Sequence, residues 1–279
     1  MTPANAFETS VGHFWGIWST RDYMCARYEL ADTVRRVGSL DGVTEALDHM
    51  RDMLRLCRGD NMGVRDLIPP MMLQLDLDQE CYDFIKWYQT EGQRSDYDWG
   101  NLDLPFLNVR GANVLEGVQY LDKKYGDVPH ISALLLLKLK LLTDVIALKL
   151  TRKVIPSHLP PELWEEVEMN VIRSPISRRW AGKSSKELTN VHQKLQYQVL
   201  TLGKILRNLN EYYVYSAWWQ HEGVLEILQS AKAIAGKDSE DEIDDMMDTS
   251  TFRNNPGSER TKKELLDDVS RNRLWGYLD

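Results

Sequence analysis

The sequence predicts an all-α protein in which stacked helical hairpins are followed by a helical bundle and a disordered acidic tail. Apolar residues recur at helical spacing between residues 21 and 88, and the pattern repeats. A second, longer apolar seam runs from residue 188 to residue 209. We therefore divide the chain into hairpins with a loop (1–128), a helical bundle (129–235) and a tail (236–279).

The first hairpin is predicted from two apolar stripes separated by Gly38 and Ser39. A helix is expected over Tyr23–Val37 and a second one over Val43–Cys57, which Gly59 can end. Residues 1–18 carry aromatic side chains, His13-Phe14-Trp15 and Trp18, which we expect to cover the open end of this hairpin, with Met1–Phe7 frayed.

The second hairpin is predicted from Asp60 to Tyr88. Asp60 and Asn61 can cap a helix whose apolar residues run from Val64 to Leu75, and the partner helix follows a turn at Asp76–Asp78. Pro69 and Pro70 interrupt the first of these helices. Either the helix bends there or it begins later; because the apolar spacing continues through the prolines, we expect a kink.

The two hairpins match after a shift of 38 positions, from Val43 to Cys81. Apolar residues then coincide in six pairs: Val34/Met72, Val37/Leu75, Val43/Cys81, Ala46/Phe84, Leu47/Ile85 and Met50/Tyr88. A period of this size, built from paired helices, is typical of tetratricopeptide- and HEAT-like stacks. One such hairpin cannot bury its own apolar face, so a neighbour must cover it.

Residues Leu54–Arg65 and Asp78–Tyr82 resemble a divergent tetratricopeptide family, in which an Asp-Asn-x-Gly-Val/Ile-Arg segment opens a repeat. More closely, residues 23–98 are similar to uncharacterised fungal proteins, some relatives of which carry a MYND zinc finger. The resemblance implies a helical protein-binding scaffold and transfers no catalytic residue. Three cysteines and no C-x-x-C pair exclude a MYND finger from this chain.

A polar stretch from Glu91 to Gly111 separates the hairpins from the bundle. Its aromatic residues, Tyr97 and Trp99 among them, favour a loop that packs on the stack. Four residues suggest a calcium loop, but the required glycine and terminal glutamate are absent, so we expect no metal there: Asp96, Asp98, Asn101 and Asp103. A short helix is expected over Val114–Tyr125.

The most apolar segment, Ile131–Leu150, has the length of a membrane span. Four charged residues oppose that reading: Lys138, Lys140, Asp144 and Lys149. We expect a central helix buried on most sides, with its charges on one wet strip, and no membrane partner. Pro160-Pro161-Glu162 opens the next helix. The basic residues around Trp180 fit a solvated loop, which argues against nucleic acid: Arg173, Arg178, Arg179, Lys183 and Lys186.

Ser184 and Glu187 predict a capping box at the start of the last well-patterned helix. Its seam has a regular 4-3 spacing: Leu188, His192, Leu195, Val199, Leu202, Leu206 and Leu209. Ile131–Leu150 suffices as its partner, so a homodimer is compatible with the seam but not required. We expect His192 to be a hydrogen-bonded core histidine.

Aromatic residues cluster after this helix, where they either pack at a hinge or line a binding groove. The candidate partner-binding residues are Tyr97, Trp99, Tyr212, Tyr213, Trp218, Trp219 and Trp275. Asp238–Asp248 contains seven acidic residues and no basic one, and it accounts for most of the net charge of −8. Residues 236–262 are expected to be disordered, followed by a short helix at 264–278 that either docks on the body or binds another protein.

These observations predict a non-catalytic protein–protein interaction scaffold with no catalytic, cofactor or metal residues. Three isolated cysteines, without a signal peptide or an Asn-x-Ser/Thr site, favour the cytoplasm or the nucleus. Two alternatives stay open. One is a regulatory factor related to MYND-finger proteins. The other is a helical enzyme whose site is not local in sequence, with these interior candidates: Asp144, His192, Tyr212, Tyr213 and Glu222.

Overall fold

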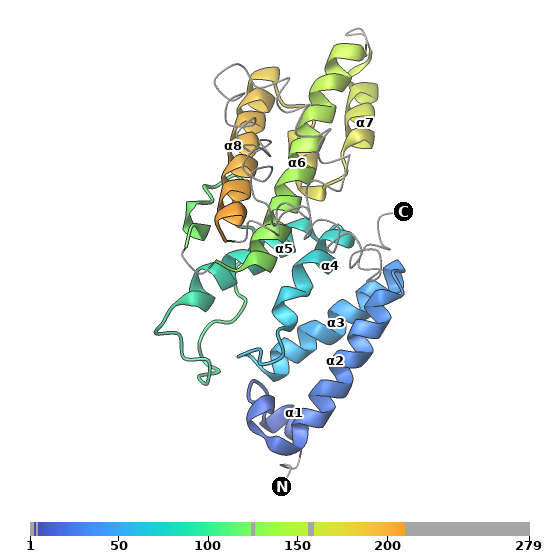
Figure 1. Ribbon diagram of the computed structural model, residues 1–279. Helices are drawn as coiled ribbons and strands as arrows, with labels where there is room; N and C mark the ends of the chain where they lie inside the picture. The colour runs from blue at the N-terminus through green and yellow to red at the C-terminus, as the bar shows by residue number, and fades with distance from the viewer. Residues whose placement is uncertain (1–2, 4, 124–125, 156–158, 210–279) are drawn as a thin grey trace, which may run out of the picture. The chain divides into compact units, whose positions relative to one another are not determined.

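The computed structural model describes residues 3, 5–123, 126–155 and 159–209 (Figure 1). By its contacts the chain divides into two units, residues 1–221 and 222–279, and all described residues belong to the first. Within the described residues the regular elements are all helical, so the all-α prediction is confirmed. The α-helices are α1 (Ala6–Thr9), α2 (Arg21–Arg36), α3 (Leu40–Leu56), α4 (Ile68–Gln74), α5 (Asp78–Gln89), α6 (Val128–Val154), α7 (Pro161–Val171) and α8 (Ser185–Leu209).

The first hairpin, α2 and α3, forms as predicted. Gly38 takes the left-handed conformation that reverses the chain, with φ +76°. The Ser39 hydroxyl oxygen accepts a hydrogen bond from the Gly42 amide at 3.1 Å and so caps α3. Gly42 also lets the two helices approach closely, because a Cβ at that position would lie 2.8 Å from the Val34 carbonyl oxygen.

The predicted kink at Pro69 and Pro70 is wrong. The Asp60 carboxylate accepts hydrogen bonds from the amides of Val64 and Arg65, both at 3.0 Å, and starts only a short 3₁₀ helix, η3 (Val64–Asp66). A separate helix, α4, then begins at Ile68 with the prolines in its first turn. A proline in the first turn of a helix loses no helical hydrogen bond. A helix that begins at Ile68 therefore costs less free energy than a longer helix that bends at the prolines.

The N-terminal segment lies against the end of the first hairpin. The Gly12 amide donates to the Arg55 carbonyl oxygen at 3.1 Å, and the Arg58 amide donates to the Gly12 carbonyl oxygen at 3.2 Å. Phe14 is fully buried. Trp18, however, is 80% exposed and stacks on the Arg21 guanidinium at 4.8 Å, so it does not cover the hairpin as expected. The expected fraying does not extend to Ala6 and Phe7, because both belong to α1 and Ala6 is buried; residues 1, 2 and 4 lie outside the described residues.

The helix expected over Val114–Tyr125 does not form; within its described part only a 3₁₀ turn, η5 (Gln119–Leu121), is present. Side chains from other helices donate hydrogen bonds to backbone carbonyl oxygens that would otherwise accept hydrogen bonds within such a helix. Lys138 on α6 donates to the Val114 carbonyl oxygen, and Gln198 on α8 donates to the Glu116 carbonyl oxygen at 2.7 Å. Tertiary contacts therefore override the local helical pattern in this segment.

Helix α6 is central to this unit and packs against α4, α5, α7 and α8 (Figure 1). Its contacts with α4 and α5 cross the boundary that we predicted between residues 128 and 129. The charged side chains of α6 do not share one solvent-exposed strip as we expected, since Lys138 and Asp144 are buried. Asp144 is satisfied there, because its carboxylate accepts hydrogen bonds from the backbone amides of Arg173 at 3.0 Å and Ser174 at 2.9 Å.

Helix α8 begins with the predicted capping box: the Ser184 amide donates to the Glu187 carboxylate at 2.9 Å, and the Glu187 amide donates to the Ser184 hydroxyl at 3.3 Å. Its seam from Leu188 to Leu206 is buried against α6, as expected. In the part of the chain that the structure describes, no helix combines the length and the apolar character needed to cross a membrane.

Candidate functional site

Of the predicted partner-binding residues, Tyr97 and Trp99 lie in the described structure, and both pack on the protein. Their rings meet Trp87 of α5 edge to face, with centroid distances of 5.5 Å and 6.0 Å. The Tyr97 hydroxyl also donates to the Pro105 carbonyl oxygen at 2.9 Å. Both side chains are half-buried, which supports the packing interpretation over a free binding surface. The other five candidates, Tyr212, Tyr213, Trp218, Trp219 and Trp275, lie outside the described residues.

Asp83 on α5 anchors the C-terminal end of the same loop. Its carboxylate accepts hydrogen bonds from the amides of Gly111 at 2.7 Å and Ala112 at 2.8 Å, and from the Gln79 side chain at 3.0 Å. Asp83 is buried, so these bonds replace the water that a carboxylate would otherwise require. The loop is thus held at Asp83 as well as through its aromatic contacts with Trp87.

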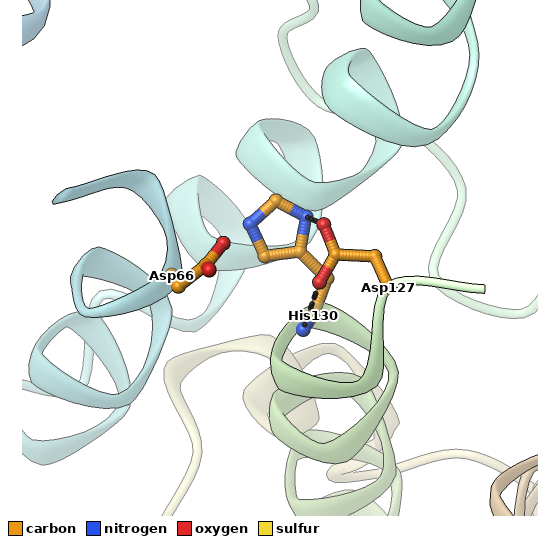
Figure 2. Close-up of side chains that lie close together, drawn as sticks. All are labelled: Asp66, Asp127 and His130. Atoms are coloured by element: carbon orange, nitrogen blue, oxygen red, sulfur yellow. Dashed lines mark hydrogen bonds and ion pairs between the residues drawn. The ribbon is translucent and has the colours of Figure 1, made fainter. Parts of the chain in front are cut away.

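The interior contains a polar junction around His130, whose side chain is fully buried at the start of α6 (Figure 2). Nε2 of His130 lies 3.1 Å from the Arg65 carbonyl oxygen, which can only accept, so Nε2 carries a hydrogen. Nδ1 lies 3.0 Å from the Gln89 side-chain nitrogen. The junction therefore connects η3, α5 and α6 through one imidazole ring.

The orientation of the Gln89 amide follows from its neighbours. Lys123 can only donate, and it donates to Oε1 of Gln93. The nitrogen of Gln93 then donates to Oε1 of Gln89 at 2.9 Å, which places the Gln89 nitrogen beside Nδ1 of His130. A carboxylate oxygen of Asp127 also lies 3.2 Å from Nδ1 of His130, so this nitrogen contacts both the Gln89 amide and the Asp127 carboxylate (Figure 2).

Asp66, Asp127 and His130 are the described residues that could hold a metal ion, since one ligand atom from each lies within 4.8 Å of the others. Burial, and next the negative charge of Asp127, raise the pKa of Asp66. Both imidazole nitrogens already have partners, and the Asp127 carboxylate also accepts from the His130 amide at 3.1 Å as the cap of α6. An ion at Nδ1 would have to displace Gln89, so the present arrangement fits a structural junction.

The interior candidates for an enzyme do not converge in the described residues. Asp144 caps the backbone at Arg173 and Ser174, whereas His192 lies on the seam of α8, where burial and then the charge of Lys149 lower its pKa to about 4. Nε2 of His192 has no hydrogen-bond partner among the described residues, contrary to the hydrogen bond that we expected. Tyr212, Tyr213 and Glu222 lie outside the described residues.

The outer face of α2 carries a row of exposed apolar side chains. Three large side chains follow one another at seven-residue intervals along this helix: Tyr23 (38% exposed), Leu30 (48%) and Val37 (70%), the last just beyond its end. One edge of the row is partly covered, because the Tyr23 ring packs edge to face on Phe7 at 4.9 Å. Met24 and Ala31, by contrast, are buried. We call Tyr23, Leu30 and Val37 the α2 row. The sequence pattern had joined these residues to the core stripe, but a single partner helix, α3, covers only part of the apolar arc.

A depression of about 430 Å³ lies beside the α2 row, between α2 and α3. Its lining contains three exposed acidic side chains of α3, Asp41, Glu45 and Asp48, which we call the acidic border. Arg27 of α2 also lines it, but its guanidinium pairs with Asp52 and lies 5.8 Å from the centroid of the Tyr23 ring. The members of the α2 row do not line the depression; Arg27 lies between the depression and Tyr23 and connects the two features. We call the surface made by the α2 row and the acidic border the α2–α3 groove.

Comparison with known proteins found no match to a family model, a curated protein or a solved structure. The residues of the groove and of the His130 junction must therefore be judged by their geometry. Sequence reasoning missed both. The junction had one local signal, Asp127 three positions before His130, which is the spacing of a helix cap. The acidic border was visible as acids at a 4-3 spacing on α3.

Proposed function

We propose that this chain is a non-catalytic protein–protein interaction scaffold whose docking surface is the α2–α3 groove. The observation that carries the proposal is the α2 row. Terminal helices of stacked hairpins ordinarily present a polar outer face to water. Here three large apolar side chains stay exposed along the terminal helix and at its end, and exposed apolar surface of this kind is typical of interaction sites.

The hairpins support this proposal in a second way. Helix α2 packs against α3, α3 against α4, and α4 against α5, so each contacts the next in chain order. Such serial packing is what a tetratricopeptide-like affiliation requires, although α4 spans only seven residues. We include that affiliation in the proposal. The groove is exposed along the first hairpin, where a partner could align with both helices.

A reducing compartment, the cytoplasm or the nucleus, is part of the proposal. Cys25, Cys57 and Cys81 are all free thiols, and Cys57 and Cys81 are buried. Burial raises the pKa of the Cys81 thiol, which keeps it protonated and unreactive. Such cysteines behave as small apolar core residues and are compatible with proteins that carry no disulfide bonds.

The test is affinity capture from cell extract with the full-length chain and a Leu30→Asp/Val37→Asp variant, followed by mass spectrometry. A scaffold that uses the α2 row should recover a defined partner that the variant loses. A matched variant, Leu136→Asp/Leu150→Asp, changes two similarly exposed leucines of α6 and should retain the partner. Identical recovery with all three proteins, or no specific partner with the unaltered chain, would refute the proposal.

A further inference from the structure

The α2–α3 groove also indicates what kind of partner it accepts. We propose that the groove binds a basic amphipathic helix of another protein, whose apolar stripe lies on the α2 row and whose lysine or arginine side chains lie against the acidic border. This inference rests on the function proposed above. Three features of the groove carry this inference: the spacing of the row, its uncompensated charge, and the charges along its opposite edge.

The spacing of the α2 row suits a helical partner. Seven residues are two helical turns, so Tyr23, Leu30 and Val37 form a line parallel to the axis of α2. The line extends for about 21 Å at 1.5 Å per residue. A partner helix of about four turns, apolar at the same heptad interval, can place one side chain beside each member of the row.

The charge of the groove is negative and not balanced locally. Asp41 and Asp48 form no ion pair with any described residue, and Glu45 has a half-buried histidine, His49, at 3.8 Å. The cation that lines the depression, Arg27, is offset by Asp52. Basic side chains of a partner would meet the acidic border without displacing an existing ion pair of Asp41 or Asp48.

The opposite edge of the α2 row carries two acidic residues and one basic residue. Asp22 and Glu29 are exposed and lie one seven-residue interval apart on the side of α2 away from the depression, and Arg36, one interval further, pairs with Asp32. A second copy of this chain docking row to row with antiparallel helices would bring one acidic border against the other, and like charges repel. The groove therefore favours a basic partner over a homodimer.

Two synthetic peptides test this inference with the full-length protein. Both are 21-residue helices with leucine at heptad spacing; one carries lysines along the flanks of the leucines, the other carries glutamates. Fluorescence anisotropy at low salt should show binding of the lysine peptide and much weaker binding of the glutamate peptide. The affinity for the lysine peptide should fall as salt is added, because exposed charges are screened.

Three variants localise the binding. Asp41→Asn/Glu45→Gln/Asp48→Asn should weaken the lysine peptide about tenfold, since each exposed charge contributes modestly. Leu30→Asp should weaken both peptides. A matched control, Glu162→Gln/Glu165→Gln/Glu166→Gln, removes the same charge from exposed positions of α7 and should bind as the unaltered protein does. Circular dichroism melting checks that each variant is folded.

The outcomes separate this inference from the proposed function. If the Asp41/Glu45/Asp48 variant binds the lysine peptide unchanged, or the α7 variant loses as much affinity, the basic partner is rejected. If the Leu30→Asp/Val37→Asp variant still loses a cellular partner in affinity capture, the proposed scaffold function stands even though the inference of a basic partner fails. Sedimentation that finds a dimer disrupted by Leu30→Asp would assign the groove to a second copy and overturn the inference.

Discussion

The side-chain nitrogen of Gln89, near the end of α5, lies 3.0 Å from Nδ1 of His130, in the first turn of α6. This contact joins the second hairpin to the central helix, and the opposite nitrogen of the same ring reaches the Arg65 carbonyl oxygen before α4. One buried imidazole thus links three segments that are distant in sequence. Its contribution to stability can be measured directly.

Replacing His130 by alanine should lower the free energy of unfolding by about 2–4 kcal/mol, because the change removes two buried hydrogen bonds and leaves a cavity. Urea denaturation followed by circular dichroism measures the difference. The control is His13→Ala at an exposed position, where a change within about 0.5 kcal/mol is expected. Equal losses for the two variants would contradict a structural role for His130.

Replacing Asp83 by alanine should release the loop between Glu91 and Ala112. Two backbone amides, those of Gly111 and Ala112, lose their acceptor, and each of these partly buried hydrogen bonds contributes about 1 kcal/mol. Hydrogen exchange followed by mass spectrometry should show faster exchange in this loop than in α8. Asp103→Ala, at an exposed position in the loop, is the control. Unchanged exchange in Asp83→Ala would show that the aromatic contacts and the Arg58 hydrogen bonds to the Asn101 and Leu104 carbonyl oxygens hold the loop without Asp83.

Lys138 should make stability depend on pH above neutrality. Burial lowers its pKa to about 7, and the charge of Glu116 opposes the shift only in part. Between pH 7 and the unfolded pKa near 10.5 the unfolded chain binds one more proton, so stability rises with pH. Relative to Lys138→Met, the unaltered protein should therefore gain about 2 kcal/mol between neutral and alkaline pH.

Unfolding free energies of the two proteins at neutral pH and near pH 9.5 test this expectation, below the range in which tyrosines ionise. Lys149→Met on the same helix is the control: burial also lowers the pKa of Lys149, but its side chain is only half-buried, so the dependence should be smaller. A difference between Lys138→Met and the unaltered protein that is independent of pH would mean that Lys138 stays charged in the fold.

His192 should make the stability of the protein depend on pH in the acidic range. Its pKa is lowered to about 4 by burial and by Lys149, whereas an unfolded histidine titrates near 6.5. Between these values the unfolded chain binds more protons, so stability falls as pH drops from 6.5 towards 4. His192→Leu should flatten this slope by on the order of 2 kcal/mol over the range, measured by urea denaturation at several pH values.

At pH 7 the same His192→Leu change should cost little, because Nε2 of His192 has no partner to lose and leucine fills a comparable volume on the seam. His13→Leu, at an exposed position, should leave the acidic slope unchanged. A large loss for His192→Leu at neutral pH, or an unaltered slope, would show that His192 makes a polar contact in the folded state.

Local patterns identified the helices that carry their own start and stop signals. The capping box of Ser184 and Glu187, the break at Gly38-Ser39 and the proline opening of α7 all lie as predicted. These signals depend on residues within one turn of each other, so a single sequence contains them in full. The errors occur where the backbone is bonded to distant side chains, as at Val114, or where two helical solutions share one pattern, as at Pro69.

The sequence by itself determined that the chain is helical, where most of its helices begin, and that α8 carries a regular apolar seam, because periodicity and capping are properties of neighbouring residues. The tertiary structure alone decided which apolar residues stay in water and which charges are buried. Periodicity cannot tell Leu30 from Ala31, nor Lys138 from Lys140, since burial depends on which helix packs against each face. For that reason the α2–α3 groove and the His130 junction emerged only from the arrangement of the helices.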